Sequence, residues 1–280
     1  MHLFCFGLGF SARTLVRRLM PQGWTISGTS RAGGDGTIAF DGSTPLPHGT
    51  FDGVTHLLIS IPPGETGDSA LKCHADDLRR IAPQLRWAGY LSTTGVYGDR
   101  HGDWVDETSP LAPTTVRGER RLDAETAWGR LGLPLHIFRL AGIYGPGRNQ
   151  LVSILDGTAK RIVKPGQIFS RIHVADIAGV LEASITRPDP GRAYNVCDDE
   201  PCPPQDVVAF AADLLKRPAP PEIAFDDAEL SPMARSFYAE SKRVANKRIK
   251  DELGYRLIYP TYREGLTALA DQLQIPEARH

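Results

Sequence analysis

The first thirty-one residues constrain the fold of this chain more than any other stretch. They comprise an apolar segment over residues 2–6, a glycine turn that starts at Gly7, a helical pattern to about Met20 and a second apolar segment over residues 24–29. Strand, tight turn, helix and strand in this order form the first crossover of a doubly wound parallel sheet. The stretch therefore predicts an α/β fold of the Rossmann type.

The turn itself has the pattern of a dinucleotide-binding site. It reads Gly7-Leu8-Gly9-Phe10-Ser11-Ala12. Gly7 allows a sharp turn, Gly9 has no Cβ to keep a pyrophosphate away from the backbone, and Ala12 lets the helix pack close to the sheet. The helix N-terminus at Phe10 and Ser11 then offers N–H groups and a positive dipole end to the phosphates. We expect these five residues to bind the cofactor.

The end of the second strand selects the cofactor. A site for NAD(H) places Asp or Glu there, to accept hydrogen bonds from the ribose hydroxyls. This chain has Thr29-Ser30-Arg31 instead. Arg31 is suited to pair with a 2′-phosphate in a bidentate manner, and the two hydroxyls are suited to donate to it. The sequence thus favours NADP(H) over NAD(H), while Arg13 in the first helix is expected to be a solvated residue.

Two further strand ends are predicted to face the cofactor. A short strand over residues 37–40 precedes Asp41, which is equally suited to accept from the adenine amino group or to start a turn before Gly42. The apolar run over residues 56–61 is typical of a central parallel strand buried on both faces. It leads into a proline-rich loop. The positions expected at the cofactor are Ser60, Ile61 and Pro62.

Composition excludes several classes of function. The chain has 280 residues, 41% of them hydrophobic, and a formal net charge of −1. That balance gives no electrostatic argument for binding nucleic acid or an anionic membrane. No apolar run is long enough to span a bilayer, and no cleavable signal precedes the first strand. The four cysteines lack a C-x-x-C spacing, so we expect free thiols in a reducing cytoplasm and no metal site.

Later motifs resemble the extended short-chain dehydrogenase/reductase family, the NAD-dependent epimerase/dehydratase group. They are STTGVYGD at residues 92–99, FRLAGIYGPG at 138–147, RIHVADIA at 171–178, AYNV at 193–196, and SKR followed by LGY and Pro260 near the C-terminus. The glycine turn departs from the usual family pattern, whose first glycine would fall on Phe6. The resemblance covers the whole chain.

This resemblance implies a two-domain organisation. A Rossmann doubly wound parallel sheet, residues 1–146 plus 174–198, would bind NADP(H). A smaller C-terminal domain, residues 147–173 plus 199–280, would bind the substrate. The resemblance also implies cofactor contacts at Ala141 and Tyr144, and a homodimer formed through helices near residues 69–86 and 114–131.

The family's catalytic pair is absent. Members carry Tyr-x-x-x-Lys on one helix, together with a Ser/Thr that orients the substrate oxygen, which Thr93 matches. Here Arg117 stands at the tyrosine position and Arg121 at the lysine position. An arginine does not exchange its proton near neutral pH. Arg121 retains a donor and a positive charge for the nicotinamide ribose. A literal Tyr-x-x-x-Lys at Tyr238–Lys242 is interpreted as chance helical spacing.

Three accounts of the arginines remain open. The protein uses another acid, with Tyr97 and Tyr144 as candidates; or Arg117 and Arg121 bind a phosphorylated or carboxylated substrate; or catalysis is lost and cofactor binding is kept. A solvated helix face, with the two arginines paired to Glu119 and Glu125, is the structural alternative.

The function expected from the sequence is therefore that of an atypical family member. It would be an NADP(H)-dependent oxidoreductase or epimerase-like enzyme acting on a nucleotide-sugar or a similar polar small molecule. The alternative is a catalytically degenerate protein that binds NADP(H) or senses redox state.

Overall fold

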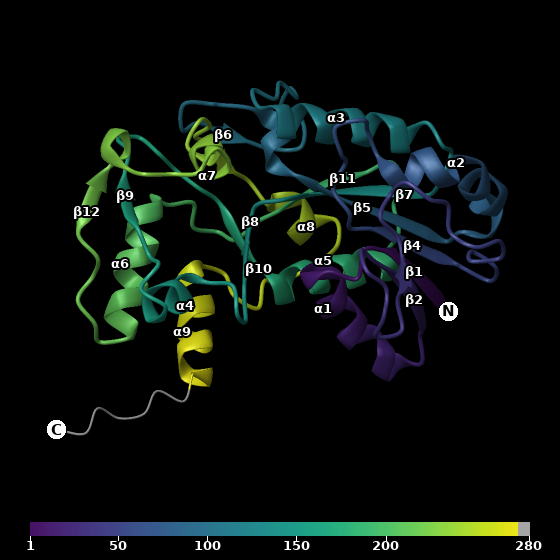
Figure 1. The fold of residues 1–280 in the computed structure, drawn as a ribbon, viewed down its shortest axis with the longest axis horizontal. Coiled ribbons are helices and arrows are strands. Elements are labelled where there is room, and N and C mark those ends of the chain that lie inside the picture. The colour runs from purple at the N-terminus through teal and green to yellow at the C-terminus, as the bar shows by residue number, and fades with distance from the viewer. Residues whose placement is uncertain (274–280) are drawn as a thin grey trace.

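A sheet of seven parallel strands forms the centre of the large lobe (Figure 1). The structure is a computed structural model that describes residues 1–273. The strand order is β11-β7-β5-β4-β1-β2-β3, so the chain begins near the middle and winds outward in both directions. The predicted doubly wound α/β fold is confirmed. The strands are β1 (His2–Phe6), β2 (Thr25–Ser30), β3 (Ile38–Ala39), β4 (His56–Ile59), β5 (Trp87–Thr93), β7 (Leu135–Leu140) and β11 (Ala193–Val196).

Helices cover both faces of this sheet, which explains why its central strands are apolar throughout. Leu3 and Cys5 of β1 pack in one core with α1 (Phe10–Leu19) and α5 (Val174–Thr186). Phe4 and Phe6, which point to the opposite face, pack in a second core with α2 (Ser69–Ile81) and α3 (Val116–Gly129). Figure 1 shows the two layers, with α2 and α3 above the sheet and α1 and α5 below it.

A smaller lobe has its own core and lies at the left of Figure 1. Its core side chains come from three helices: α4 (Gln150–Leu155), α6 (Pro204–Leu214) and α9 (Tyr262–Gln272). Outside them lie β9 (Arg161–Val163), β12 (Glu222–Ala224) and α7 (Pro232–Phe237). Strands β9 and β12 pair in parallel although about sixty residues separate them in the chain.

Two short ladders join the lobes. One pairs β8 (Gly142–Tyr144) with β10 (Arg171–His173), and the other pairs β6 (Trp104–Val105) with β13 (Arg243–Val244). Val244, together with Ile249 and Leu253 of the α8 (Lys247–Asp251) region, packs in the core of the large lobe. This part of the C-terminal segment therefore contributes to the core of the large lobe, and the predicted domain bounds stay a prediction.

The motif at residues 171–178 fixes this junction. The Nδ1 atom of His173 accepts the Ala175 N–H at 3.2 Å and so caps α5. The buried carboxylate of Asp176 accepts from the Tyr255 hydroxyl at 2.8 Å and from the N–H groups of Ile258 and Tyr259. The motif is thus structural, because it ties the C-terminal segment to the large lobe.

Some predicted boundaries differ from those observed. The helix expected to run to about residue 86 ends at Ile81, where a 3-10 turn containing Pro83 follows. Tyr238 and Lys242 do not share a helix, because α7 ends at Phe237 and Lys242 binds Glu240 at 2.7 Å. The 3-10 helices are η1 (Met20–Gln22), η2 (Ala82–Gln84), η3 (Thr94–Tyr97) and η4 (Phe225–Asp227). Between residues 1 and 273, no helix has the length and apolarity required to cross a membrane.

Candidate functional site

The glycine turn is held in place by the neighbouring strands. Gly7 has φ +88°, and a Cβ there would lie 2.6 Å from Cγ2 of Ile61, so only glycine fits without strain. Its N–H donates to Oγ1 of Thr29 at 2.9 Å, and the Leu8 N–H donates to the Thr29 carbonyl at 2.7 Å. The turn is therefore braced by β2 on one side and by the end of β4 on the other.

Gly9 has the opposite environment. A Cβ at this position would meet no atom within 4 Å among the described residues, so packing does not require glycine there. No side chain caps α1, and its backbone ladder starts with the Arg13 N–H, which donates to the Gly9 carbonyl at 2.8 Å. The N–H groups from Gly9 to Ala12 therefore lack intrahelical acceptors. An open surface with free N–H groups at a helix N-terminus fits a dinucleotide pyrophosphate.

The residues at the end of β2 divide into two kinds. Thr29 is 1% exposed and its hydroxyl accepts the Gly7 N–H, so it braces the turn, while its expected contact with the cofactor stays a prediction. Ser30 lies 2.7 Å from Thr37, hydroxyl to hydroxyl. Arg31 is exposed and has no hydrogen bond or ion pair from its side chain within residues 1–273. Arg13 is exposed but not simply solvated, since its Nε donates to the Leu8 carbonyl at 2.8 Å.

Asp41 starts a turn. Its Oδ1 accepts from the N–H and the hydroxyl of Ser43, each at 2.8 Å, and these bonds lower the pKa of the exposed carboxyl. The geometry favours the turn over the adenine contact, the two alternatives that the sequence left open. Ser60 and Pro62 follow β4 beside the glycine turn, where the Ser60 N–H donates to the Phe6 carbonyl at 2.9 Å.

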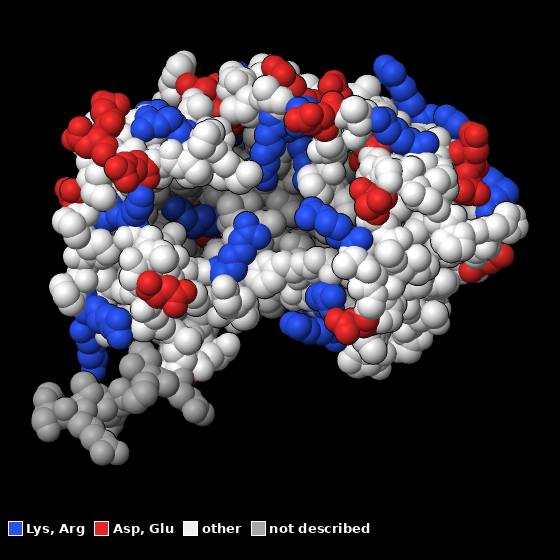
Figure 2. Space-filling view, viewed as in Figure 1, with Lys and Arg blue, Asp and Glu red and all other residues white. Residues whose placement is uncertain are grey.

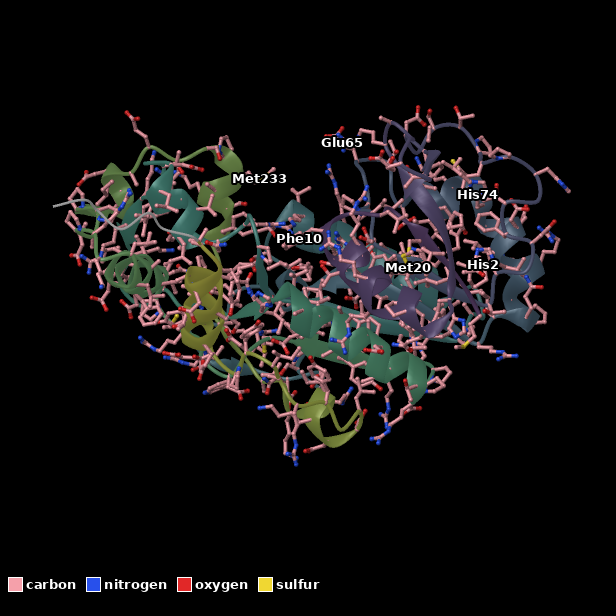
Figure 3. The ribbon with its side chains drawn as sticks, turned by 90° about the horizontal axis from the view of Figure 1, so that it is seen from below. His2, Phe10, Met20, Glu65, His74 and Met233 are labelled. Atoms are coloured by element: carbon pink, nitrogen blue, oxygen red, sulfur yellow. The ribbon has the colours of Figure 1, made fainter. Side chains whose placement is uncertain are left out.

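The mouth of the cleft lies between the lobes. In Figure 3, Phe10 at the start of α1 lies below Glu65, on the loop after β4, and Met233, on α7. Phe10 also reaches the β8 side of the cleft, because a Cβ on Gly145 would lie 3.2 Å from its Cζ. Figure 2 shows a hollow in this region with Lys and Arg side chains around it.

Thr93 is the last residue of β5. Its Oγ1 accepts the Gly95 N–H at 3.2 Å, which leaves the hydroxyl proton free to donate. The side chain is partly exposed. The predicted role in orienting a substrate oxygen is thus geometrically open.

Tyr97 has no such freedom. It is fully buried, its hydroxyl donates to Oδ1 of Asn195 at 2.7 Å, and it accepts from Nη1 of Arg139 at 3.0 Å. Burial raises the pKa of Tyr97 to about 12. Tyr97 is therefore a structural residue, and the expectation that it supplies the missing acid is wrong.

A buried ion pair adjoins Tyr97 and was not predicted from the sequence. Nη2 of Arg139 lies 2.9 Å from the carboxylate of Glu125, and both side chains are almost completely buried. Ser92 donates to the same carboxylate. The pair joins β7 to α3, and through Ser92 to β5, so it fixes the helix that carries Arg117 and Arg121.

The two arginines of α3 have different surroundings. Arg121 points to the sheet, where Nη1 donates to the Leu91 carbonyl and the guanidinium lies 5.7 Å from the Tyr90 ring centre. Arg117 is exposed, and its guanidinium lies 5.3 Å from the ring centre of Phe237. Neither forms the ion pair with Glu119 or Glu125 that the solvated-face alternative expects, since Glu125 binds Arg139.

A cavity of about 360 Å³ opens beside β8 and reaches into the small lobe. Tyr144 and Tyr262 line it, and both hydroxyls are buried without a hydrogen-bond partner among the described residues. Burial raises the pKa of Tyr144 above its ordinary value, so the hydroxyl keeps its proton at neutral pH. Ala141, which precedes β8, is buried, and its N–H donates to the Val196 carbonyl at 3.1 Å.

Behind this cavity lies a buried acid. Asp198 is 1% exposed, and its Oδ2 has no partner among residues 1–273. Burial raises the pKa of Asp198 to about 8, so the side chain is largely neutral at pH 7. No sequence motif singled it out, because only the fold removes it from water.

Comparison with known proteins supports the fold. No protein-family model matches the chain. A functionally unknown conserved protein from Silicibacter pomeroyi DSS is 55% identical with a TM-score of 0.91, over 98% of this chain and 99% of that one. Because its function is unknown, it adds support for the structure and none for an activity.

Two solved structures carry nucleotide cofactors. The dTDP-glucose 4,6-dehydratase of Bacillus anthracis with NAD is 16% identical, with a TM-score of 0.77 over 97% of this chain and 96% of that one. The human epimerase family protein SDR39U1 with NADPH is 18% identical, with a TM-score of 0.75 over 98% of this chain and 100% of that one. The resemblance indicated by the motifs is thus confirmed at the level of the fold.

Proposed function

We propose that this chain, which shares the fold of the NAD-dependent epimerase/dehydratase family, is an NADP(H)-dependent oxidoreductase or epimerase-like enzyme. The observation that carries the proposal is the glycine turn. Gly9 leaves open space at the N-terminus of α1, where the backbone N–H groups are free. At Gly7, a side chain would collide with Ile61. Structures of this fold contain NAD or NADPH.

The preference for NADP(H) rests on Arg31. It follows β2, where an acidic residue would favour NAD(H), and its guanidinium has no partner within the described chain. Arg13, anchored to the turn through Leu8, places a second guanidinium nearby. Two arginines beside the turn favour a cofactor with an additional phosphate.

The chain's own residues suit particular tasks. When bound, the nicotinamide would exchange a hydride with a carbon of the substrate. Thr93 has a free hydroxyl proton with which to orient the substrate oxygen. Arg121 is braced on Leu91, so it contributes fixed positive charge on the cofactor side of α3. The substrate is a polar small molecule, such as a nucleotide-sugar.

One observation favours a second candidate function. Arg117 replaces the family's tyrosine, and Tyr97 is bound within the core. A protein that binds NADP(H) without turnover, as a redox sensor, would need neither group.

Two readouts separate the two functions: absorbance at 340 nm detects net oxidation or reduction of the cofactor, and chromatography of the nucleotide-sugars detects a redox-neutral conversion such as epimerisation. The purified protein would be mixed with NADP⁺ or NADPH and a panel of nucleotide-sugars, with Thr93→Val as the matched variant. Turnover that Thr93→Val lowers at unchanged cofactor affinity supports the enzyme. Tight NADPH binding without turnover on any substrate supports the sensor.

A further inference from the structure

Two arginines near the end of α7 lack carboxylate partners among the described residues. Arg117 comes from the first turn of α3 in the large lobe, and Arg148 from the loop between β8 and α4. Both are exposed, and neither side chain forms a hydrogen bond or an ion pair within residues 1–273. They therefore differ from Arg171, which lines the same cavity as Arg148 but donates to the Phe169 carbonyl at 3.2 Å.

The end of α7 connects the two arginines. Phe237, its last residue, stacks on the guanidinium of Arg117 at 5.3 Å. Tyr238, the next residue, lines the cavity together with Arg148. Desolvation, followed by the charges of Arg121 and Arg148, lowers the pKa of Arg117. The ring that contacts Arg117 and the ring that lines the cavity with Arg148 thus belong to adjacent residues, which brings the two unpaired guanidinium groups to one region of the surface.

The nearest acid does not neutralise them. Glu240 is the carboxylate that opposes this lowering of the Arg117 pKa. Its oxygens are already bound by Lys242 at 2.7 Å and by the hydroxyls of Thr114 and Thr115 at 3.1 and 3.4 Å. Among residues 1–273, no carboxylate therefore pairs with Arg117 or Arg148, and both remain available to an anion.

The two tyrosines of the cavity wall do not present their hydroxyls to the cavity. Tyr144 and Tyr262 are 7% and 1% exposed, and their hydroxyl oxygens are buried. A Cβ on Gly265 would lie 2.0 Å from the Tyr144 hydroxyl, so that hydroxyl packs against α9. The two tyrosines therefore shape the wall of the cavity.

We propose that Arg117 and Arg148 together bind an anionic group of the substrate, a phosphate or a carboxylate. The proposal rests on the proposed function, because it names the substrate class of that same cleft. It assigns the residue at the family's tyrosine position to substrate anchoring. The lobes then close on a ligand that each holds by one arginine.

Calorimetric titration of the full chain saturated with NADP⁺ tests this. The probes are inorganic pyrophosphate and malonate, which separate the two anion chemistries, with uncharged malonamide as the control. We expect at least one anion to bind and malonamide not to bind. Arg117→Gln and Arg148→Gln should each weaken that binding about tenfold or more, a change typical of losing a charge-assisted contact. Arg79→Gln, whose parent is exposed and pairs with Asp76 on α2, should bind as wild type does.

Three results would overturn the proposal. The first is that neither anion binds, and the second is that the arginine variants bind the anion as tightly as wild type. The third is that the variants lose affinity for NADP⁺ to the same extent, which would assign Arg117 and Arg148 to the cofactor. If NADP⁺ itself does not bind, the proposed function fails separately. The anion titration is then repeated on the protein without NADP⁺, and weaker anion binding by Arg117→Gln and Arg148→Gln still supports the proposed anion site. Circular dichroism shows that each variant is folded.

Discussion

The cofactor half and the substrate half of the cleft are built by different means. The glycine turn offers backbone N–H groups from one short stretch, and its shape depends on two glycines and the hydroxyl of Thr29. The facing half depends on side chains from α3, the loop after β8, α7 and α9. A site made from local backbone is specified by a short motif, whereas a site made from distant side chains is specified only by the fold.

The largest expected effect concerns the network that positions α3. In Arg139→Met the carboxylate of Glu125 stays buried without its partner, so we expect a loss of about 3–5 kcal/mol in the free energy of unfolding. Urea denaturation measures it. Arg18→Met, which breaks the exposed pair with Glu182 at 2.6 Å, is the matched control, with an expected loss of about 0–1 kcal/mol. Equal losses in both variants would show that the buried pair does not organise the cleft.

The next prediction separates the two glycines of the turn. Gly9→Ala places a methyl group in open space, so we expect a folded protein whose affinity for NADPH is about 100-fold lower because the phosphates are kept from the backbone. Fluorescence titration measures the affinity. Gly129→Ala, another glycine with open space around it, should bind NADPH normally. Unchanged binding in Gly9→Ala would place the pyrophosphate elsewhere.

A smaller effect is expected from pH on the substrate side. The pKa of Asp198 is raised from 3.8 to about 8, so the folded protein holds a proton that the unfolded chain releases. This contribution to stability is fully present below about pH 4 and is lost as pH rises through 8. Asp198→Asn has no such titrating group, so between pH 5 and 9 its melting temperature should fall less than that of wild type. Each kcal/mol of stability that wild type loses in this range lowers its melting temperature by about 2–4 °C. If the melting temperatures of wild type and Asp198→Asn change equally with pH, the raised pKa of Asp198 is contradicted.

The sequence predicted the elements whose signals are local. The strand, turn and helix of residues 2–20, the end of β2 and the motif at residues 193–196 lie where their patterns indicate. The absence of the family's Tyr-x-x-x-Lys pair was also evident, because it needs only a count along one helix.

Contacts between distant segments escaped prediction. Thr29 was expected to face the cofactor because it ends a strand, but its side chain points to Gly7. Tyr97 matched a family motif, yet Asn195 and Arg139, from β11 and β7, enclose its hydroxyl. Likewise, nothing in the sequence places Phe237 against Arg117, some 120 residues apart. Such contacts depend on how the two lobes pack, which no local pattern encodes.

The most direct test of the account is the affinity of the chain for NADPH and NADH before and after Arg31→Ala. Wild type should bind NADPH at least about tenfold more tightly than NADH, a preference that loss of the pairing with the 2′-phosphate should abolish. Affinity for NADH should stay unchanged. Arg263→Ala, remote from the turn, is the control. Equal affinity of wild type for both cofactors, unaltered by Arg31→Ala, would contradict the assignment of NADP(H).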